Sequence, residues 1–539
     1  MFVHRVRRPL RSCFPTLGRL RTPRIVLLAA GMMCAAHALA PSDPFEAIRR
    51  SIPAQLQQQH VPSLAVAVAQ DGRIVWEQGF GLADKEHQRP ATAQTMYSLA
   101  SISKPLTATA LMTLVRAGKL DLDHPINDYL GNSPLVARIG DARNATVRRV
   151  ANHSSGLPEH YQFFYANEPW RRPTADIIIQ RYGQLMTPPG ETFRYSNLGY
   201  GILDHVIARL AGKSFAEVMH DAVFAPLGMQ RSAVDTTARL GALEAVRYGH
   251  DGQPIPPYQT DHDGASAIYA SAHDMARFGM FQLKSHLTDQ AAILPDALID
   301  AMHQPTMDEG NGKSYGVGWE ISQQSGYEVI SHDGDMPGVR TELRLIPARN
   351  LVVVVLTNAE ERLAPVVADQ IMQAMLPGWT PAPKSPSSTT TTFEPPDEWI
   401  GVWKGTVDTY QGAIPITLQV LPSGDIKVTL EDQLTSLLNE AHITKSGFLR
   451  GVTTGSLHID DAARRPYVLG FNLKLRDGHR LDGAITARAD DDGVSPTHGL
   501  FPSVDGQPRP QRIQNRGFVL AQWAELSKQP TTTPSKDRP

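Results

Sequence analysis

The chain has 539 residues, too many for a single hydrophobic core, so we expect two domains with tails. A hydrophobic fraction of 41% and a charged fraction of 20% are typical of a globular protein and exclude a fibrous or disordered one. The net charge is −2, but residues 1–40 hold seven arginines and no acidic residue, and the remaining 45 basic and 54 acidic groups give no basic surface for nucleic acid.

The first 40 residues have the features of a secretory signal peptide. A basic start precedes the short apolar run Ile25–Ala36, and His37–Ala40 has the small residues of a cleavage site. The run is shorter than the about 20 residues of a membrane span, so we favour a removed signal over an anchor, and a periplasmic or secreted protein. Because Cys13 and Cys34 both lie in this leader, we expect no disulfide and no thiol nucleophile in the mature chain.

Residues 41–378 are predicted to form an α+β domain. Alternating apolar residues on both sides of Asp71-Gly72 predict a hairpin, and Glu342–Ile346 and Leu351–Leu356 flank a second turn. The sequence between these hairpins is mostly helical or irregular. Strands at both ends of a domain with helices inserted between them predict an antiparallel sheet flanked by helices.

Ser101-Ile-Ser-Lys104 stands directly before an apolar helical run. If a helix begins at Ser101, the i,i+3 spacing places Ser101 and Lys104 side by side, and the helix dipole favours negative charge on the serine. A nucleophilic serine needs a base, and burial can lower the pKa of a lysine enough for that role. Taken alone, the pattern also fits a helix-capping serine beside a solvated lysine.

Two further patterns follow along the chain. In Tyr195-Ser-Asn197, the phenol can move protons and the carboxamide can hold a substrate amide, although a packing tyrosine and a helix cap fit equally well. His332-Asp-Gly334 ends a strand-like run, where glycine lets main-chain N–H groups approach a substrate carbonyl. By itself this third pattern also describes a surface histidine in a turn.

The sequence changes character after the first domain. Residues 379–397 are rich in proline, serine and threonine, cannot pack a core, and are predicted to be a linker. In residues 398–523, apolar side chains alternate with a period of two around turn sequences, which predicts a small all-β barrel or sandwich. Residues 524–539 are predicted to be a polar tail.

Together, Ser-x-x-Lys, Tyr-x-Asn and His-x-Gly in this order resemble the serine β-lactamase and penicillin-binding-protein family, which includes class C β-lactamases, DD-peptidases, esterases and D-aminopeptidases. The resemblance covers residues 42–376. Five other stretches look like the same family: Leu120–Ile126, Asn152–Pro158, Pro226–Met229, Asp274–Phe278 and Tyr315–Trp319. The C-terminal β region is similar in pattern to lipocalin-like barrels appended to some of these peptidases; it could cover the cleft or serve as a spacer or envelope-binding module.

The resemblance implies acyl transfer through a covalent ester on Ser101. Lys104 and Tyr195 would move the proton, and which of them is the base stays open. Asn197 would orient the substrate. The N–H groups of Ser101 and of Asp335, which follows His-x-Gly, would form the oxyanion hole.

Two positions depart from the relatives that bind β-lactams. His332 stands where many of them carry lysine, which puts a permanent cation in doubt. Asp333 replaces a threonine whose hydroxyl helps to hold the β-lactam carboxylate, and a carboxylate there would repel another one. With Gly334, these residues are expected to line the substrate side of the site, and they argue against a dedicated β-lactamase.

We therefore expect an exported serine hydrolase that acts on small esters, amides or D-amino-acid peptides, including peptidoglycan-derived ones. A β-lactamase or DD-carboxypeptidase is the alternative within the family. A non-catalytic penicillin-binding or structural homologue is the alternative from another class, although such a chain usually loses Ser101, Lys104 or Tyr195. We expect no cofactor or metal, since the histidines lack the paired spacing of ligands, and no nucleic-acid partner or membrane span after signal removal.

Overall fold

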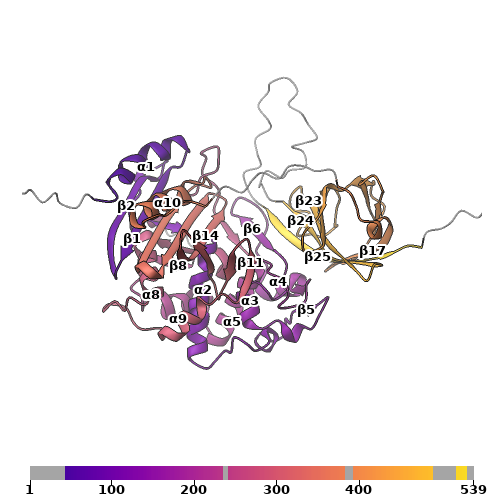
Figure 1. Ribbon diagram of the computed structural model, residues 1–539, viewed down its shortest axis with the longest axis horizontal. Coiled ribbons are helices and arrows are strands. Elements are labelled where there is room, and N and C mark those ends of the chain that lie inside the picture. Colours follow the sequence, from indigo (N-terminus) through magenta and orange to yellow (C-terminus); the bar gives the residue numbers. More distant parts are fainter. Residues whose placement is uncertain (1–42, 235–240, 383–392, 490–516, 531–539) are drawn as a thin grey trace, which may run out of the picture. The chain divides into compact units, whose positions relative to one another are not determined.

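The structure is a computed structural model that describes residues 43–234, 241–382, 393–489 and 517–530 (Figure 1). The predicted signal peptide and most of the predicted linker lie outside these residues. Residue contacts group the described residues from Pro44 onward into one unit. Within the described ranges, no helix is both long enough and apolar enough to cross a membrane.

A nine-stranded antiparallel sheet is the centre of the first region, and both predicted hairpins belong to it. Its order is β11-β12-β13-β14-β15-β16-β1-β2-β3, so the first strand and the last strand of the region pair in the middle of the sheet. The strands are β1 (Ser63–Gln70), β2 (Arg73–Asp84), β3 (Arg89–Pro90), β11 (Met307–Gly310), β12 (Lys313–Tyr315), β13 (Glu320–Gln324), β14 (Tyr327–Met336), β15 (Val339–Ile346) and β16 (Leu351–Thr357).

Helices pack against this sheet and fill the rest of the region (Figure 1). They are α1 (Glu46–Gln58), α2 (Ser103–Arg116), α3 (Val147–Ala151), α4 (Ala175–Tyr182), α5 (Asn197–Ala211), α6 (Phe215–Met219), α7 (Asp263–Ser266), α8 (Ala272–Gln282), α9 (Asp296–Met302) and α10 (Leu363–Met375), with a 3₁₀ turn, η1 (Ala100–Ile102), directly before α2. Short strands between them are β4 (Met96–Ser98), β5 (Val136–Ala137), β6 (Tyr161–Tyr165), β7 (Gln184–Leu185), β8 (Ser232–Val234), β9 (Tyr258–Thr260) and β10 (Ile268–Ser271).

The middle strands of the sheet are buried on both faces. In β1, Val66 and Val68 pack in a core with α1 and α10, whereas Ala65 and Ala67 pack in a second core with α2 and α8. Successive side chains of a strand point to opposite faces, so β1 serves both cores. This arrangement confirms the predicted sheet flanked by helices. The helix α2 lies deep in the second core, where every residue from Ser103 to Met112 is buried.

The C-terminal region is a nearly closed, barrel-like antiparallel sheet, in agreement with the predicted all-β fold. Its order is β20-β19-β18-β17-β25-β24-β23-β22-β21. The first two residues of β25, Phe518 and Val519, also pair with β6. The strands are β17 (Gly401–Thr409), β18 (Gly412–Val420), β19 (Ile426–Leu430), β20 (Ser436–Leu437), β21 (Asn439–Ile443), β22 (Phe448–Thr453), β23 (Val468–Arg476), β24 (Arg480–Arg488) and β25 (Phe518–Lys528).

Two predicted boundaries need correction. Residues 524–528, assigned to the polar tail, continue β25, because Ala524 and Leu526 alternate inward and are buried in the barrel. Trp379, assigned to the linker, is buried against α1 and α10, and its indole N–H donates to Asp369 Oδ1 at 3.4 Å. A single aromatic residue in a polar stretch can belong to a core that the local composition does not reveal.

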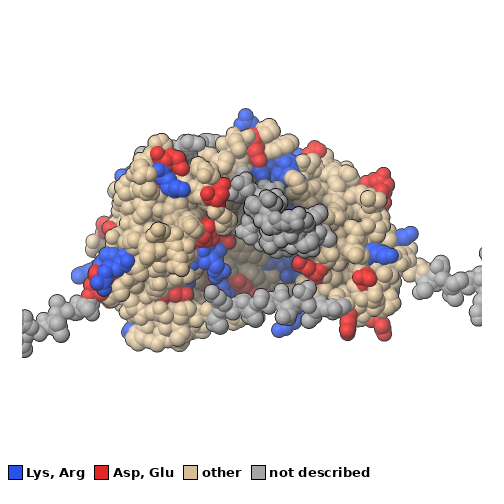
Figure 2. All heavy atoms as spheres, turned by 90° about the horizontal axis from the view of Figure 1, so that it is seen from above, with Lys and Arg blue, Asp and Glu red and all other residues tan. Residues whose placement is uncertain are grey.

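Charged side chains of both signs are interspersed on the face seen in Figure 2. Lysine and arginine lie near aspartate and glutamate there, and neither sign dominates that face. This distribution agrees with the nearly balanced charge of the sequence.

Candidate active site

Ser101 lies in the 3₁₀ turn η1, and the helix α2 begins two residues later, at Ser103. The expectation that a helix begins at Ser101 was therefore wrong by two residues. Ala100, the residue before Ser101, takes a left-handed φ of 48°, so an α-helix cannot extend back through it. The i,i+3 spacing still brings the two side chains together, since Lys104 Nζ is 3.0 Å from Ser101 Oγ.

Lys104 is buried and its side-chain nitrogen has three oxygen neighbours within hydrogen-bond distance. Nζ lies 3.0 Å from Ser101 Oγ, 2.8 Å from Asn197 Oδ1 and 3.2 Å from the Ala265 carbonyl oxygen. Burial lowers the pKa of Lys104 well below its usual value, and the negative charge of Asp333 opposes this effect. An amine with a lowered pKa that touches a serine hydroxyl can accept the proton of that hydroxyl.

Tyr195 lies on the other side of the lysine. Lys104 Nζ is 4.7 Å from the centre of the Tyr195 ring, and the imidazole of His153 is 4.4 Å from the same ring. Burial raises the pKa of Tyr195 well above its usual value, and a side-chain hydrogen bond with Ser101 acts in the opposite direction. The phenol is therefore protonated at neutral pH and can donate its proton to a group held at Ser101.

Asn197 is the first residue of α5 and is not its N-cap. Ser196 caps the helix, because its side chain accepts the N–H of Gly199 at 3.2 Å. The Asn197 carboxamide is left to contact Lys104. The local sequence thus places Tyr195 just before the helix and Asn197 at its start, both facing the same lysine.

The third motif lies inside β14 and not at the end of a strand. β14 continues to Met336 because its pairing with β15 extends to the Met336–Val339 turn. Gly334 is needed for a close approach: a Cβ there would lie 2.2 Å from Thr341 Oγ1 and 2.3 Å from the Leu99 carbonyl oxygen. The absence of a side chain lets β14 lie directly against the turn that carries Ser101.

His332 is buried and neutral. Its Nδ1 is 2.7 Å from the carbonyl oxygen of Asp333, and its Nε2 is 2.8 Å from the Tyr315 hydroxyl. An Nδ1–H tautomer donates to the carbonyl and accepts from the phenol. Burial first, and the charge of Lys104 second, lower the pKa of His332 to about 4. The doubt about a permanent cation at this position agrees with that value.

Asp333 and Asp335 share one guanidinium group. Arg340 Nη2 lies 3.1 Å from Asp333 Oδ2, and Nη1 lies 2.7 Å from Asp335 Oδ2. The two carboxylates lie on the same, more exposed face of β14, with the Asp333 side chain 43% exposed. The sequence predicted a carboxylate on the substrate side of the site at Asp333, and the structure pairs this carboxylate with a cation on the neighbouring strand.

Residues outside the three motifs also contact the site. The His153 imidazole lies against Tyr195, and its Nδ1 accepts the N–H of Ser196 at 3.1 Å. Tyr315 holds His332. Both residues belong to family-like stretches of the sequence, which is the signal that could have identified them. The Ala265 carbonyl gives no such signal, because a main-chain acceptor has no side-chain signature.

Comparisons with known proteins agree with this geometry. A family model described as Beta-lactamase matches residues 48–375. Penicillin-binding protein 4* of Bacillus subtilis is 26% identical over 337 residues, which is 57% of this chain and 70% of that protein. The "Unguisins hydrolase ungD'" of Aspergillus campestris is 27% identical over 323 residues, which is 56% of this chain; the match spans 59% of that hydrolase, less than two thirds of its length.

Among solved structures, the octameric penicillin-binding protein homologue from Pyrococcus abyssi aligns with a TM-score of 0.54 and 21% identity. The alignment covers 81% of this chain and 97% of that one. It therefore extends beyond residues 48–375, which the family model matches. At this identity the likeness concerns the fold. The match of the family model to more than half of the chain establishes that the protein belongs to the Beta-lactamase family.

Proposed function

We propose that the protein is an exported hydrolase that acts on small esters, amides or D-amino-acid peptides. The substrate transfers its acyl group to Ser101, which forms a covalent ester. The observation that carries the proposal is the buried Lys104 amine, 3.0 Å from Ser101 Oγ and flanked by Asn197 and Tyr195. Export rests on the signal-like leader of residues 1–40.

The reaction divides into two halves around a serine ester. Lys104 takes the proton of Ser101 as Oγ attacks the carbonyl carbon, and Tyr195 donates its proton to the leaving oxygen or nitrogen. The proton on Lys104 then passes back to Tyr195. A water molecule then attacks the acyl-enzyme: Lys104 takes a proton from the water and Tyr195 donates its proton to Ser101 Oγ, which releases the acid and restores Ser101. A second transfer of the proton from Lys104 to Tyr195 returns both groups to their starting states. The N–H groups of Ser101 and Asp335 stabilise the oxyanion in both halves.

The charges near Ser101 favour substrates without a carboxylate beside the scissile bond. His332 is neutral at pH 7 and supplies no positive charge to such a group. Asp333 and Asp335 both pair with Arg340, and the Asp333 carboxylate remains 43% exposed on this face of β14. A carboxylate of the substrate would be repelled there, whereas a neutral ester or a substrate amine would not.

A hydrolysis panel tests the proposal. It compares nitrocefin, short-chain p-nitrophenyl esters, D-alanyl p-nitroanilide and D-Ala-D-Ala peptides by kcat/KM. We expect the esters or the D-alanyl anilide to exceed both nitrocefin and the D-Ala-D-Ala peptides, which carry carboxylates. Fastest turnover of nitrocefin or of the D-Ala-D-Ala peptides would instead favour a β-lactamase or a DD-carboxypeptidase, and no turnover in the whole panel would favour a non-catalytic homologue.

The variant Asp333→Thr tests the electrostatic part separately. It should raise the kcat/KM ratio of nitrocefin to ester by about tenfold or less, because one carboxylate in a partly exposed site contributes on the order of 1 kcal/mol. Asp369→Asn is the matched control, since Asp369 also pairs with an arginine of β15, at 2.7 Å from Arg344. An unchanged ratio in Asp333→Thr would remove charge as the reason for the preference.

A further inference from the structure

The third acceptor of Lys104 comes from an element that none of the three motifs contains. The carbonyl oxygen of Ala265 lies 3.2 Å from Lys104 Nζ. Ala265 belongs to α7 (Asp263–Ser266), a helix of four residues that is too short to be stable alone. The position of this carbonyl must therefore depend on the neighbours of α7.

Two buried side chains hold α7 through its second residue. The N–H of Gly264 donates to Asp204 Oδ2 at 2.6 Å, and the carbonyl oxygen of Gly264 accepts from Thr107 Oγ1 at 2.7 Å. A Cβ on Gly264 would lie 2.7 Å from the Tyr200 carbonyl oxygen and 2.8 Å from Asp204 Cβ. Only glycine therefore allows the backbone of α7 to lie this close to α5. The next residue, Ala265, supplies the carbonyl that contacts Lys104.

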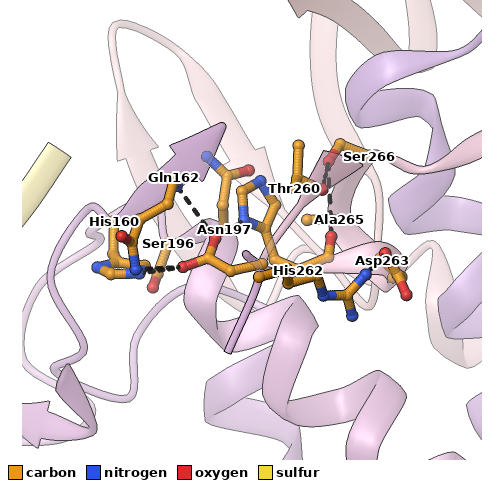
Figure 3. Close-up of polar contacts among 12 residues, drawn as sticks. His160, Gln162, Ser196, Asn197, Thr260, His262, Asp263, Ala265 and Ser266 are labelled. Carbon is orange, nitrogen blue, oxygen red and sulfur yellow. Dashed lines mark hydrogen bonds and ion pairs between the residues drawn. The ribbon is translucent and has the colours of Figure 1, made fainter. Parts of the chain in front are cut away.

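Asp204 and Asn197 belong to the same helix and act on the same lysine. They are seven residues apart on α5, which is about two turns, so both face α2 and α7. Figure 3 shows Asn197 close to the segment that carries His262, Asp263 and Ala265. Asn197 contacts Lys104 directly, whereas Asp204 reaches it through the backbone of α7.

The surroundings of Asp204 fit a carboxyl group that serves as a hydrogen-bond acceptor. Asp204 is buried, and the nearby Asp263 already pairs with Arg172 at 2.6 Å. Burial, with a contribution from Asp263, raises the pKa of Asp204 well above its usual value. A carboxyl group that resists ionisation still accepts the N–H of Gly264, and an asparagine amide oxygen can do the same.

We propose that Asp204 is a positioning residue for the general base: by holding the N–H of Gly264, it keeps the Ala265 carbonyl against Lys104 Nζ. This inference rests on the role of Lys104 in the proposed function. If the Ala265 carbonyl moves away, Lys104 keeps two of its three acceptors and no longer holds one orientation toward Ser101 Oγ. Acylation should then slow, while substrate binding, which involves no atom of Asp204, should not change.

The test compares Asp204→Ala with Asp204→Asn in the full-length protein. For the best substrate of the panel, Asp204→Ala should lower kcat by about 10- to 100-fold, the range that a small misplacement of a catalytic group produces, with KM within about twofold. The rate constant of covalent labelling by a fluorophosphonate should fall by a similar factor. Asp204→Asn keeps an acceptor for Gly264 and should restore both rates to within about threefold of the wild type.

Matched controls separate positioning from general stability. Asp274 is also buried and accepts a backbone N–H, from Arg231 at 2.6 Å, but it lies on α8 and its other hydrogen bonds are with Ser232 and Ser271. Asp274→Ala should lower Tm and leave kcat within about twofold.

If Asp204→Ala does not fold, Thr107→Val serves as the test variant in its place and should lower kcat by about 3- to 10-fold. Thr109→Val, on the same helix, loses a hydrogen bond to the Pro105 carbonyl and one from Gln282 Nε2; neither involves α7, so kcat should stay unchanged.

Three results would overturn the inference. They are wild-type kcat in Asp204→Ala, a folded Asp204→Asn as slow as Asp204→Ala, and an equal loss of kcat in Asp274→Ala. Failure of the proposed function gives a different result, since the wild-type protein itself would then neither turn over the panel nor react with the fluorophosphonate.

Discussion

At the scale of single residues, burial acts on Lys104 and Tyr195 in opposite directions. It lowers the pKa of the amine and raises the pKa of the phenol, because in each case the charged form is disfavoured. Two titratable groups whose pKa values are moved apart around one nucleophile suit the two halves of acid–base catalysis. These directions support the proposed roles of Lys104 as proton acceptor and Tyr195 as proton donor, which the sequence left open.

Variants of these two residues should behave as a unit. Lys104→Ala and Tyr195→Phe should each lower kcat by about two to four orders of magnitude, the usual contribution of acid–base groups, and the double variant should be little worse than either one. Tyr97→Phe is the control, because it removes a buried hydroxyl that lies 2.9 Å from Ser63 Oγ. Steady-state kinetics on the preferred ester measures all four. Near-native kcat in Tyr195→Phe would show that Tyr195 packs in the site and does not transfer a proton.

The part of the site that follows from local spacing could be predicted from the sequence. Three residues of separation suffice to place Lys104 beside Ser101, although the turn that carries Ser101 is not α-helical. The neutral state of His332 could only be suspected, since it depends on burial by distant segments. Ala265 and Asp204 could not be found, because their contacts join α7 and α5 through main-chain atoms.

At the scale of elements, β14 extends beyond the end that the sequence predicted for it. The sequence predicted that the strand ends at the third motif. The strand continues since the face of Asp333 and Asp335 is partly exposed and Arg340 on β15 pairs with both. The alternation of the buried His332 and Gly334 with these two acids is the period of two that marks a strand.

The close approach of β14 to η1 makes Gly334→Ala a test at this scale. The added Cβ would collide with Thr341 Oγ1 and the Leu99 carbonyl oxygen, so the strand must move away from the turn that carries Ser101. We expect a loss of stability of about 1–3 kcal/mol and a fall in kcat/KM of about 100-fold, measured by thermal unfolding and ester hydrolysis. Gly470→Ala, in a strand where the nearest atom is a flexible arginine carbon at 3.3 Å, should change neither. Wild-type kcat/KM in Gly334→Ala would show that the approach is not needed.

At the scale of the whole molecule, the change of period along the sequence correctly indicated two kinds of architecture. Apolar alternation predicted the barrel strands, and hairpins at both ends of residues 41–378 predicted the central sheet. The pairing of β25 with β6, through Val519 and Tyr161, could not be predicted, because it joins segments more than 300 residues apart. Such pairings depend on the folded surfaces of both regions and not on any local pattern.

The central claim is that Ser101 becomes acylated, and mapping of a covalent adduct tests it most directly. The full-length protein is treated with a fluorophosphonate, its intact mass is measured, and the modified peptide is sequenced by mass spectrometry. We expect one adduct, on Ser101, and none in Ser101→Ala. Ser103→Ala is the matched control, because Ser103 is a buried serine of the same motif that accepts the N–H of Ile268 at 3.1 Å, and it should still be labelled on Ser101. Equal labelling of Ser101→Ala, or an adduct on another residue, would contradict the mechanism.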